Sequence, residues 1–438
     1  LDALTALQLS TDYSERPEEH NIRHAVDHIL TSNKAAGKED ALDESDEDII
    51  NLVAMFFDYV LDDRHLPVPV QALISRLQIP ILKVALKDKS FFSNSKHPAR
   101  QLVNDIASSA VGWDDNNALE KEKQYREANR IVHHVIDNFT GNLDIFESAV
   151  EEFRQISKPE KQKATVIEKR TQEAALGKAK AEHARAEAQD VLYERLKQSL
   201  LPANIMDFLV QDWLRVLLYV QLKFGPESTE WLEAKQLVDL LAWGLRPHND
   251  ERSLQRLNKI RGDVLTKMTH GLEAIKAGTD HVQHMLAITE QTIEMILNQQ
   301  LDESTLTSLS PQQLQMLGRN NQAQVDDWEQ LSESQKEFLK AQSAAKEYIA
   351  TVEKIQPGTW VDYTPGETAK KYRCKLAMVT DPGESYVFVN RYGLRVFEKK
   401  KLEIALDLHQ GHLKILENGM LFDRAMDNIT DKLKRLAS

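Results

Sequence analysis

The sequence contains a single cysteine, Cys374, among its 438 residues. A disulfide within the chain is therefore excluded, and so is a zinc site made of four cysteines. Apolar stretches without a charged residue, such as residues 216–222 (VLLYVQL), are far too short to span a bilayer. We expect no membrane span, and the scarcity of cysteine is typical of a reducing compartment, so we predict a cytoplasmic protein.

The common motifs of enzymes are also missing. The chain has no G-x-x-x-x-G-K-[ST] or G-x-G-x-x-G loop, no H-E-x-x-H zinc motif and no G-x-S-x-G nucleophile turn. His20, His24 and His28 recur every four residues, and we interpret them as a polar helix surface, with metal binding as the alternative. We predict no catalytic residues, no metal and no cofactor, with an enzyme of unrecognised type as the alternative.

Acidic residues outnumber basic ones, and the net charge is −13. A strongly acidic chain repels the phosphate backbone, so nucleic acid is an unlikely partner for the whole protein. Apolar residues make up 42% and charged residues 28% of the chain, which is typical of a globular protein. The length allows two to four domains.

Helical spacing of apolar residues covers most of the chain, and the predicted fold is mainly α, with multi-helix bundles, a long exposed helix and a small C-terminal β-barrel-like domain. From Gln356 on, the apolar residues alternate and tight turns recur, which predicts four to five short strands. We also expect one long helix over residues 253–300. The predicted segments are an acidic linker (1–48), a helical packet (49–152), a long exposed helix (153–200), a second helical packet (201–300), a polar loop (301–331), a helix (332–349), the small β-domain (350–412) and a C-terminal helix (413–438).

The β-domain differs in charge from the rest of the chain. Between Pro357 and Lys401, nine Lys and Arg residues face five acidic residues, a net charge of +4. Arginine side chains bind phosphate or carboxylate groups through paired hydrogen bonds. One interpretation is therefore an anion site, and the other is a sheet face that packs beside acidic helices of the same chain. The candidate ligand-binding residues are Arg373, Lys375, Asn390, Arg391 and Arg395.

Cys374 lies between two cations, Arg373 and Lys375, which would lower the pKa of its thiol. The alternation of Tyr372, Cys374, Leu376 and Met378, however, places the sulfur on the apolar face of the strand. We therefore predict a buried structural thiol.

Several long stretches resemble a known family. They are FDYVLDDRHLPVPVQALISRLQIPILKVALKDKSFF, HPARQLVNDIA, KLAMV, YVFVNRYGLRVFEKKKLEIALDLHQG and LFDRAMDNI. From about Ile49 to its end, the chain resembles an uncharacterised proteobacterial domain-of-unknown-function family, whose members are often labelled thymidine-phosphorylase-like. A nucleoside phosphorylase, the activity that this label names, would require a phosphate-binding site, and the sequence has no glycine-rich phosphate-binding loop.

The β-segment also resembles, more weakly, a PilZ barrel, a fold that bacteria use to sense cyclic di-GMP. The resemblance implies a cyclic dinucleotide ligand, held by an R-x-x-x-R stretch and a D/N-x-S-x-x-G stretch. Arg391 and Arg395 match the first by spacing, whereas Asn390 and Gly393 match the second without its serine.

These observations favour a non-enzymatic regulatory or scaffold protein that acts through protein partners, with the β-domain as a docking or sensing module. The alternatives are a cyclic di-GMP receptor and an enzyme of unrecognised type. The sequence identifies neither the partner nor the oligomeric state.

Overall fold

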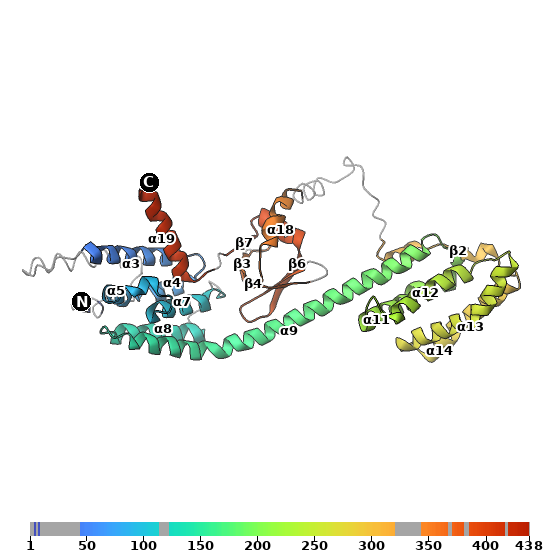
Figure 1. Ribbon diagram of the computed structural model, residues 1–438, viewed down its shortest axis with the longest axis horizontal. Coiled ribbons are helices and arrows are strands. Elements are labelled where there is room, and N and C mark those ends of the chain that lie inside the picture. The colour runs from blue at the N-terminus through green and yellow to red at the C-terminus, as the bar shows by residue number, and fades with distance from the viewer. Residues whose placement is uncertain are drawn as a thin grey trace, which may run out of the picture. The chain divides into compact units, whose positions relative to one another are not determined.

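The computed structural model describes residues 4–5, 8, 44–113, 122–319, 343–366, 370–380, 385–416 and 419–437. Most of the predicted acidic linker, including His20, His24 and His28, lies outside the described residues. The chain forms two compact units (Figure 1). Unit 1 contains residues 1–172, 341–379 and 385–438, and unit 2 contains residues 173–340 and 380–384.

Unit 1 contains a helical packet whose core is rich in phenylalanine. The rings of Phe56 and Phe91 lie 5.1 and 5.2 Å from the ring of Phe422, which belongs to the C-terminal helix. That helix therefore packs against α3 and α7, although the sequence placed it in a segment of its own (Figure 1). The helices of the packet are α3 (Glu44–Asp62), α4 (Val68–Ser75), α5 (Gln78–Lys87), α6 (Ser90–Ser93), α7 (Pro98–Ala110), α8 (Lys123–Asn138) and α19 (Leu421–Ala437).

Proline residues begin several of these helices. Pro67 is the N-cap of α4, Pro80 lies in the first turn of α5, and Pro98 is the first residue of α7. Proline is tolerated at these positions because a first-turn N–H has no partner within the helix. Among the described residues no single helix is long and apolar enough to cross a membrane, although the bent pair α4 and α5 meets the criterion jointly.

The long helix α9 (Asp144–Leu196) begins earlier than residue 153, where the sequence analysis places its start. The reason is an apolar stripe of Phe146, Val150 and Phe153, which is buried in the core of the helical packet. From residue 158 to residue 174 its side chains are exposed or half-buried. The helix then contributes its last part, including the buried Leu192, to unit 2.

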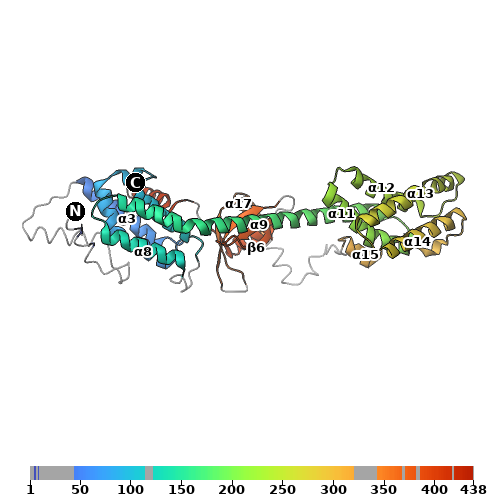
Figure 2. The same ribbon diagram turned by 90° about the horizontal axis from the view of Figure 1, so that it is seen from below.

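Unit 2 is a packet of helices around the buried Trp213 and Trp231. The predicted single helix over residues 253–300 is wrong: it consists of two helices packed on each other, and the chain reverses around Lys276, whose φ is 54°, and Gly278 (Figure 2). The short strands β1 (Leu201–Pro202) and β2 (Leu306–Thr307) pair antiparallel. The helices are α10 (Ala203–Phe208), the π-helical segment η3 (Leu209–Trp213), α11 (Leu214–Phe224), α12 (Thr229–Gly244), α13 (Glu251–Ala274), α14 (Thr279–Leu297), the 3-10 helix η4 (Glu303–Thr305) and α15 (Pro311–Met316).

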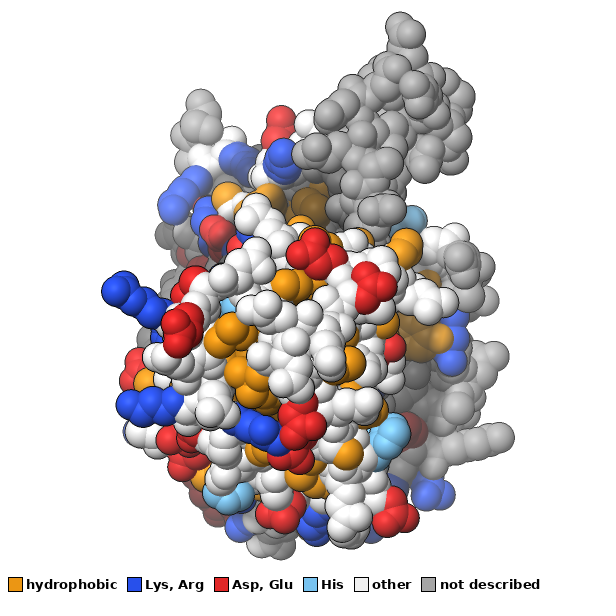
Figure 3. All heavy atoms as spheres, turned by 90° about the vertical axis from the view of Figure 1, so that its right-hand side faces the viewer, with side chains coloured by type: hydrophobic (Ala, Val, Ile, Leu, Met, Phe, Trp, Pro, Cys, Tyr) orange, Lys and Arg blue, Asp and Glu red, His pale blue; other side chains and the backbone are white. Residues whose placement is uncertain are grey.

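The surface of unit 2 carries charges of both signs. On the face shown in Figure 3, acidic and basic side chains alternate around small groups of hydrophobic ones. The predicted polar loop (301–331) contains η4, β2 and α15 up to residue 319, and its remainder lies outside the described residues. Of the predicted helix (332–349), the described part contains the 3-10 turn η6 (Lys346–Tyr348), and α17 (Ile349–Glu353) follows it.

The β-domain of unit 1 is a five-stranded antiparallel sheet with strand order β6-β5-β4-β3-β7. Its strands are β3 (Trp360–Tyr363), β4 (Tyr372–Val379), β5 (Ser385–Val389), β6 (Arg395–Lys400) and β7 (Leu413–Ile415). The first four form a meander, and α18 (Lys401–His409) then leads to β7, which pairs with β3 at the far side. The sheet therefore extends past residue 412, where the sequence analysis ended the β-domain. Cys374 is completely buried, as predicted, and burial raises the pKa of its thiol.

Candidate functional site

Arg373 on β4 joins the β-domain to the helical packet. Its Nε and Nη2 atoms donate to the Asp362 carboxylate at 2.8 and 3.1 Å, and Nη1 and Nη2 donate to the carbonyl oxygens of His65 and Arg64 at 2.7 and 3.1 Å. Burial alone would raise the pKa of Asp362, but hydrogen bonds from Arg373 and Lys371 outweigh it and lower that pKa. This buried arginine holds the β-domain on the loop between α3 and α4.

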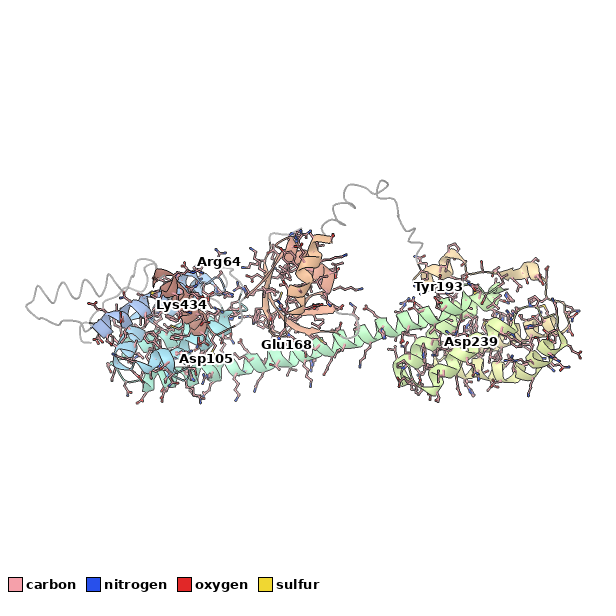
Figure 4. The ribbon with its side chains drawn as sticks, turned by 45° about the horizontal axis from the view of Figure 1, so that its top comes forward. Arg64, Asp105, Glu168, Tyr193, Asp239 and Lys434 are labelled. Carbon is pink, nitrogen blue, oxygen red and sulfur yellow. The ribbon has the colours of Figure 1, made fainter. Side chains whose placement is uncertain are left out.

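Two more cations of the β-domain bind acids on the helices. Lys375 Nζ lies 2.8 Å from Glu168 Oε2 on α9, and the labelled Glu168 lies where α9 passes the sheet (Figure 4). Arg391, at the turn between β5 and β6, forms an ion pair with Glu122, the residue before α8. Part of the cationic excess therefore serves contacts within the chain, as the second of the two interpretations expects.

Two glycines permit close approach between the β-domain and the helices. A Cβ atom on Gly393 would lie 2.4 Å from the carbonyl oxygen of Ala164 and 2.5 Å from the backbone nitrogen of Glu168. A Cβ atom on Gly112 would lie 2.6 Å from Arg391 Cβ and 2.7 Å from the Trp360 ring. The β5–β6 turn therefore rests directly on the backbone of α9, and Trp360 rests on the end of α7.

A pocket of about 330 Å³ lies where α7, α9 and the β-domain meet. Its wall combines aromatic rings with charges of both signs. The aromatic residues are Trp113, Trp360 and Tyr392, the cations are Lys161, Lys375 and Arg391, and the acids are Glu160 and Glu168. We call it the junction pocket. Its volume is at the lower end of the range typical of ligand sites.

Three donors in the wall of the junction pocket are buried without a partner. In the part of the chain that the structure describes, Ser109 Oγ, Trp113 Nε1 and Arg391 Nη1 make no hydrogen bond. The other terminal nitrogen of Arg391, Nη2, donates to Glu122 and to the Tyr392 hydroxyl. The Arg391 guanidinium also lies 4.4 Å from the centre of the Tyr392 ring and 5.7 Å from that of Trp113.

The five candidate residues selected from the sequence lie in different environments in the structure. Lys375 and Arg391 come together in the junction pocket. Arg373 is buried elsewhere, and Arg395 is exposed and pairs with Glu398 at 3.2 Å. Asn390 caps its own turn, because its Oδ1 accepts from the backbone nitrogens of Tyr392 and Leu394. Binding of an anion at these residues stays a prediction, and an anion on Lys375 or on Arg391 Nη2 would compete with a carboxylate of the chain itself.

Three residues in the wall of the junction pocket, Ser109, Trp113 and Trp360, were not among the candidates selected from the sequence. Ser109 and Trp113 lie at the end of α7, far from the β-domain in sequence, and no local pattern links the two regions. The one signal was Gly112, because glycine is often found where the backbone approaches another group closely.

Lys399 forms a second polar contact within the β-domain. Its Nζ lies 4.7 Å from the centre of the Tyr363 ring and donates to Tyr363 Oη at 2.9 Å and to Asp407 Oδ2 at 2.5 Å. The Phe397 ring lies 4.4 Å from that of Tyr363. The chain's own lysine thus covers this aromatic pair.

Three family models match the chain. They belong to a family described as a protein of unknown function, DUF1631: its second domain matches residues 1–142, its third domain residues 174–290, and its C-terminal tudor domain residues 347–416. The chain belongs to the DUF1631 family. The prediction of a domain-of-unknown-function family is confirmed, whereas neither the thymidine-phosphorylase-like label nor the PilZ resemblance is supported by these matches. No protein of curated function and no solved structure matched the chain.

The DUF1631 tudor match agrees with the extent of the sheet. It runs from residue 347 to residue 416 and so includes β7, the strand that pairs with β3. The match to the third domain falls within unit 2. In this DUF1631 chain the tudor-like domain and the helical packet therefore share unit 1 and form the wall of one pocket.

Proposed function

We propose that this DUF1631 protein is a non-enzymatic regulatory or scaffold protein that binds protein partners through its tudor-like domain and the adjoining helical packet. The observation that carries the proposal is the junction pocket, whose wall comes from both parts. Because Arg373, Lys375 and Arg391 hold the tudor-like domain in place, the two parts present one preformed surface, and binding there costs little ordering entropy.

The groups in the wall of the junction pocket suit recognition better than proton transfer. One of its two acids, Glu168, is already paired with Lys375, so the wall offers no pair of free carboxylates that could act as general acid and general base. Tryptophan, tyrosine and arginine are the residues enriched at the energetic centres of protein interfaces, and all three are present here. A protein partner is therefore favoured over a substrate.

A cyclic dinucleotide fits this pocket less well than a peptide does. Its two phosphates would compete with Glu122 for Arg391 and with Glu168 for Lys375, at the cost of leaving those carboxylates unpaired. A peptide can use the aromatic rings and the unpaired donors without breaking either ion pair.

The test compares two neighbouring substitutions in the 438-residue chain, expressed with an affinity tag in cells of the organism of origin. Tyr392 lines the pocket and is 46% exposed, whereas Leu394, in the same turn, is 53% exposed. We expect a defined set of proteins to co-purify with the wild type and with Leu394→Ser and to be lost with Tyr392→Ser, as measured by quantitative mass spectrometry. Identical sets for all three forms, or no protein above a tag-only control, would contradict the proposal.

A further inference from the structure

The unpaired donors of the junction pocket indicate the chemistry of its ligand. Folded proteins leave few buried polar atoms without a partner, because each such atom has lost its hydrogen bonds to water. Ser109 Oγ, Trp113 Nε1 and Arg391 Nη1 are three such atoms in the wall of one pocket. Trp113 is only 2% exposed, so its indole N–H has no access to bulk water.

All three groups can donate a hydrogen bond, and two of them can only donate. An indole N–H and a guanidinium N–H have no acceptor capacity, and a serine hydroxyl can donate as well as accept. The complementary ligand atom is therefore an oxygen acceptor. A guanidinium next to such an atom favours a carboxylate or a phosphate, whose oxygens form short charge-assisted bonds.

The charge balance of the pocket favours a carboxylate over a phosphate. The wall of the pocket contains three cations, Lys161, Lys375 and Arg391, and two acids, Glu160 and Glu168, which is a net charge of +1. A group with two negative charges would exceed that charge, whereas one carboxylate would balance it. Trp360 and Tyr392 add an aromatic wall for the apolar atoms next to that carboxylate.

We propose that the junction pocket binds the carboxylate of an acidic side chain in a peptide segment of a partner protein. This inference rests on the proposed function, since it names the group by which the partner is recognised. The carboxylate accepts from Arg391 Nη1, with Ser109 and Trp113 as the further donors, and the bond from Arg391 Nη2 to Glu122 remains. Tyr392 is half exposed, so its ring can turn outward to admit the peptide.

The probe is a library of blocked pentapeptides with random flanks and a fixed central glutamate, matched by a second library with a fixed central glutamine. Both are selected on the immobilised 438-residue chain, and the retained peptides are then titrated by calorimetry. We expect the glutamate peptides to bind at least tenfold more tightly than their glutamine counterparts, because the charged acceptor strengthens its hydrogen bonds. Equal retention of the two libraries would overturn the inference.

Two serines with buried, unpaired hydroxyls provide the matched variants. Ser109 lines the junction pocket, whereas Ser75, at the end of α4, does not. Ser109→Ala removes a donor that contributes nothing to the free protein, so we expect affinity for the glutamate peptides to fall by about five- to tenfold while the melting temperature does not fall. Ser75→Ala should leave the affinity unchanged. Equal effects of both substitutions on binding would exclude Ser109 as a ligand group.

Inorganic phosphate is the second probe, and it distinguishes a phosphate site from a carboxylate site. If phosphate binds with the same sensitivity to Ser109→Ala and displaces the glutamate peptides, the pocket is a phosphate site and the peptide assignment is wrong. If the glutamate peptides show no preference while Tyr392→Ser still abolishes partner binding in cells, the acidic-group inference fails and the proposed function stands.

Discussion

The two units each contain a pocket with a buried tryptophan, and the two tryptophans differ in one hydrogen bond. In unit 2 a pocket of about 230 Å³ lies between α11, α12 and α13, and Trp213 in its wall donates from Nε1 to the carbonyl oxygen of Ala234 at 2.9 Å. In unit 1, Trp113 is equally buried, at 2% exposure, and its Nε1 has no partner among the described residues. The Trp213 indole therefore has its hydrogen-bond partner within the fold, whereas the Trp113 indole N–H is left available to a ligand.

The two pockets also differ in what assembles them. The wall of the unit 2 pocket is mainly apolar, and Gly271 allows α13 to lie against the Trp213 ring, since a Cβ there would be 2.4 Å from it. The junction pocket depends on a separate β-domain being held in place by ion pairs and by the absence of a side chain at Gly393. Loss of a single arginine should therefore affect unit 1 more than unit 2.

The largest effect is expected for Arg373→Met. The substitution removes two hydrogen bonds to Asp362 and two to backbone carbonyls. The Asp362 carboxylate, whose side chain is only 10% exposed, is then paired with Lys371 but no longer with an arginine. Breaking a buried ion pair on one side costs about 3–5 kcal/mol. We expect the free energy of unfolding of unit 1, measured by urea denaturation, to fall by that amount.

Arg261→Met is the matched control in unit 2. Arg261 joins α13 to Glu290 and Glu294 on α14 at 2.6 and 2.9 Å, but both glutamates are about half exposed. Exposed pairs contribute roughly 0–1 kcal/mol. A loss for Arg373→Met no greater than that for Arg261→Met would contradict the proposed dependence of the junction on its ion pairs.

The role of Arg373 also illustrates what the sequence could not provide. The mainly helical fold and the five-stranded domain follow from the spacing of apolar residues, and the burial of Cys374 follows from its place in the alternation of β4. The excess of cations in the β-domain was visible too. Its partners were not, because Glu122 and Glu168 come from helices more than two hundred residues away, and only the tertiary structure brings them to Arg391 and Lys375.

Other errors arose from local backbone geometry. The predicted helix over residues 253–300 has uninterrupted helical spacing, and the chain nevertheless turns near Lys276, a non-glycine residue with positive φ. Burial of the α13–α14 contact compensates for that strain. The greater length of α9 has another cause, since the helix begins at Asp144, where Phe146 and Val150 are buried in the helical packet.

A smaller effect, roughly 3 kcal/mol, is expected for Gly393→Ala. Its φ of 79° is unfavourable for alanine, and the added Cβ would press on the backbone of α9, which cannot move aside as a side chain could. We expect the β-domain to detach from α9, so that limited proteolysis cleaves the β5–β6 turn faster than in the wild type.

Gly358→Ala separates the two causes of that effect. Gly358 has a φ of 98°, so alanine is strained there as well, but no atom lies within 4 Å of the added Cβ. Its cost should therefore be only the backbone term, about 1–2 kcal/mol. Similar proteolysis rates for the two variants would mean that the contact of Gly393 with α9 does not hold the domain.

The smallest effect tests the two tryptophans directly. Trp113→Phe and Trp213→Phe remove the same ring atoms from positions of equal burial, so the lost packing should cost the two variants the same free energy of unfolding. Trp213→Phe also removes the hydrogen bond to Ala234, whereas Trp113→Phe removes a donor that was unpaired. Trp213→Phe should therefore cost about 1 kcal/mol more in the free energy of unfolding, measured by circular dichroism in urea. If the two costs were equal, the Trp113 indole would already be hydrogen-bonded in solution, and the junction pocket would lose one of the donors assigned to its ligand.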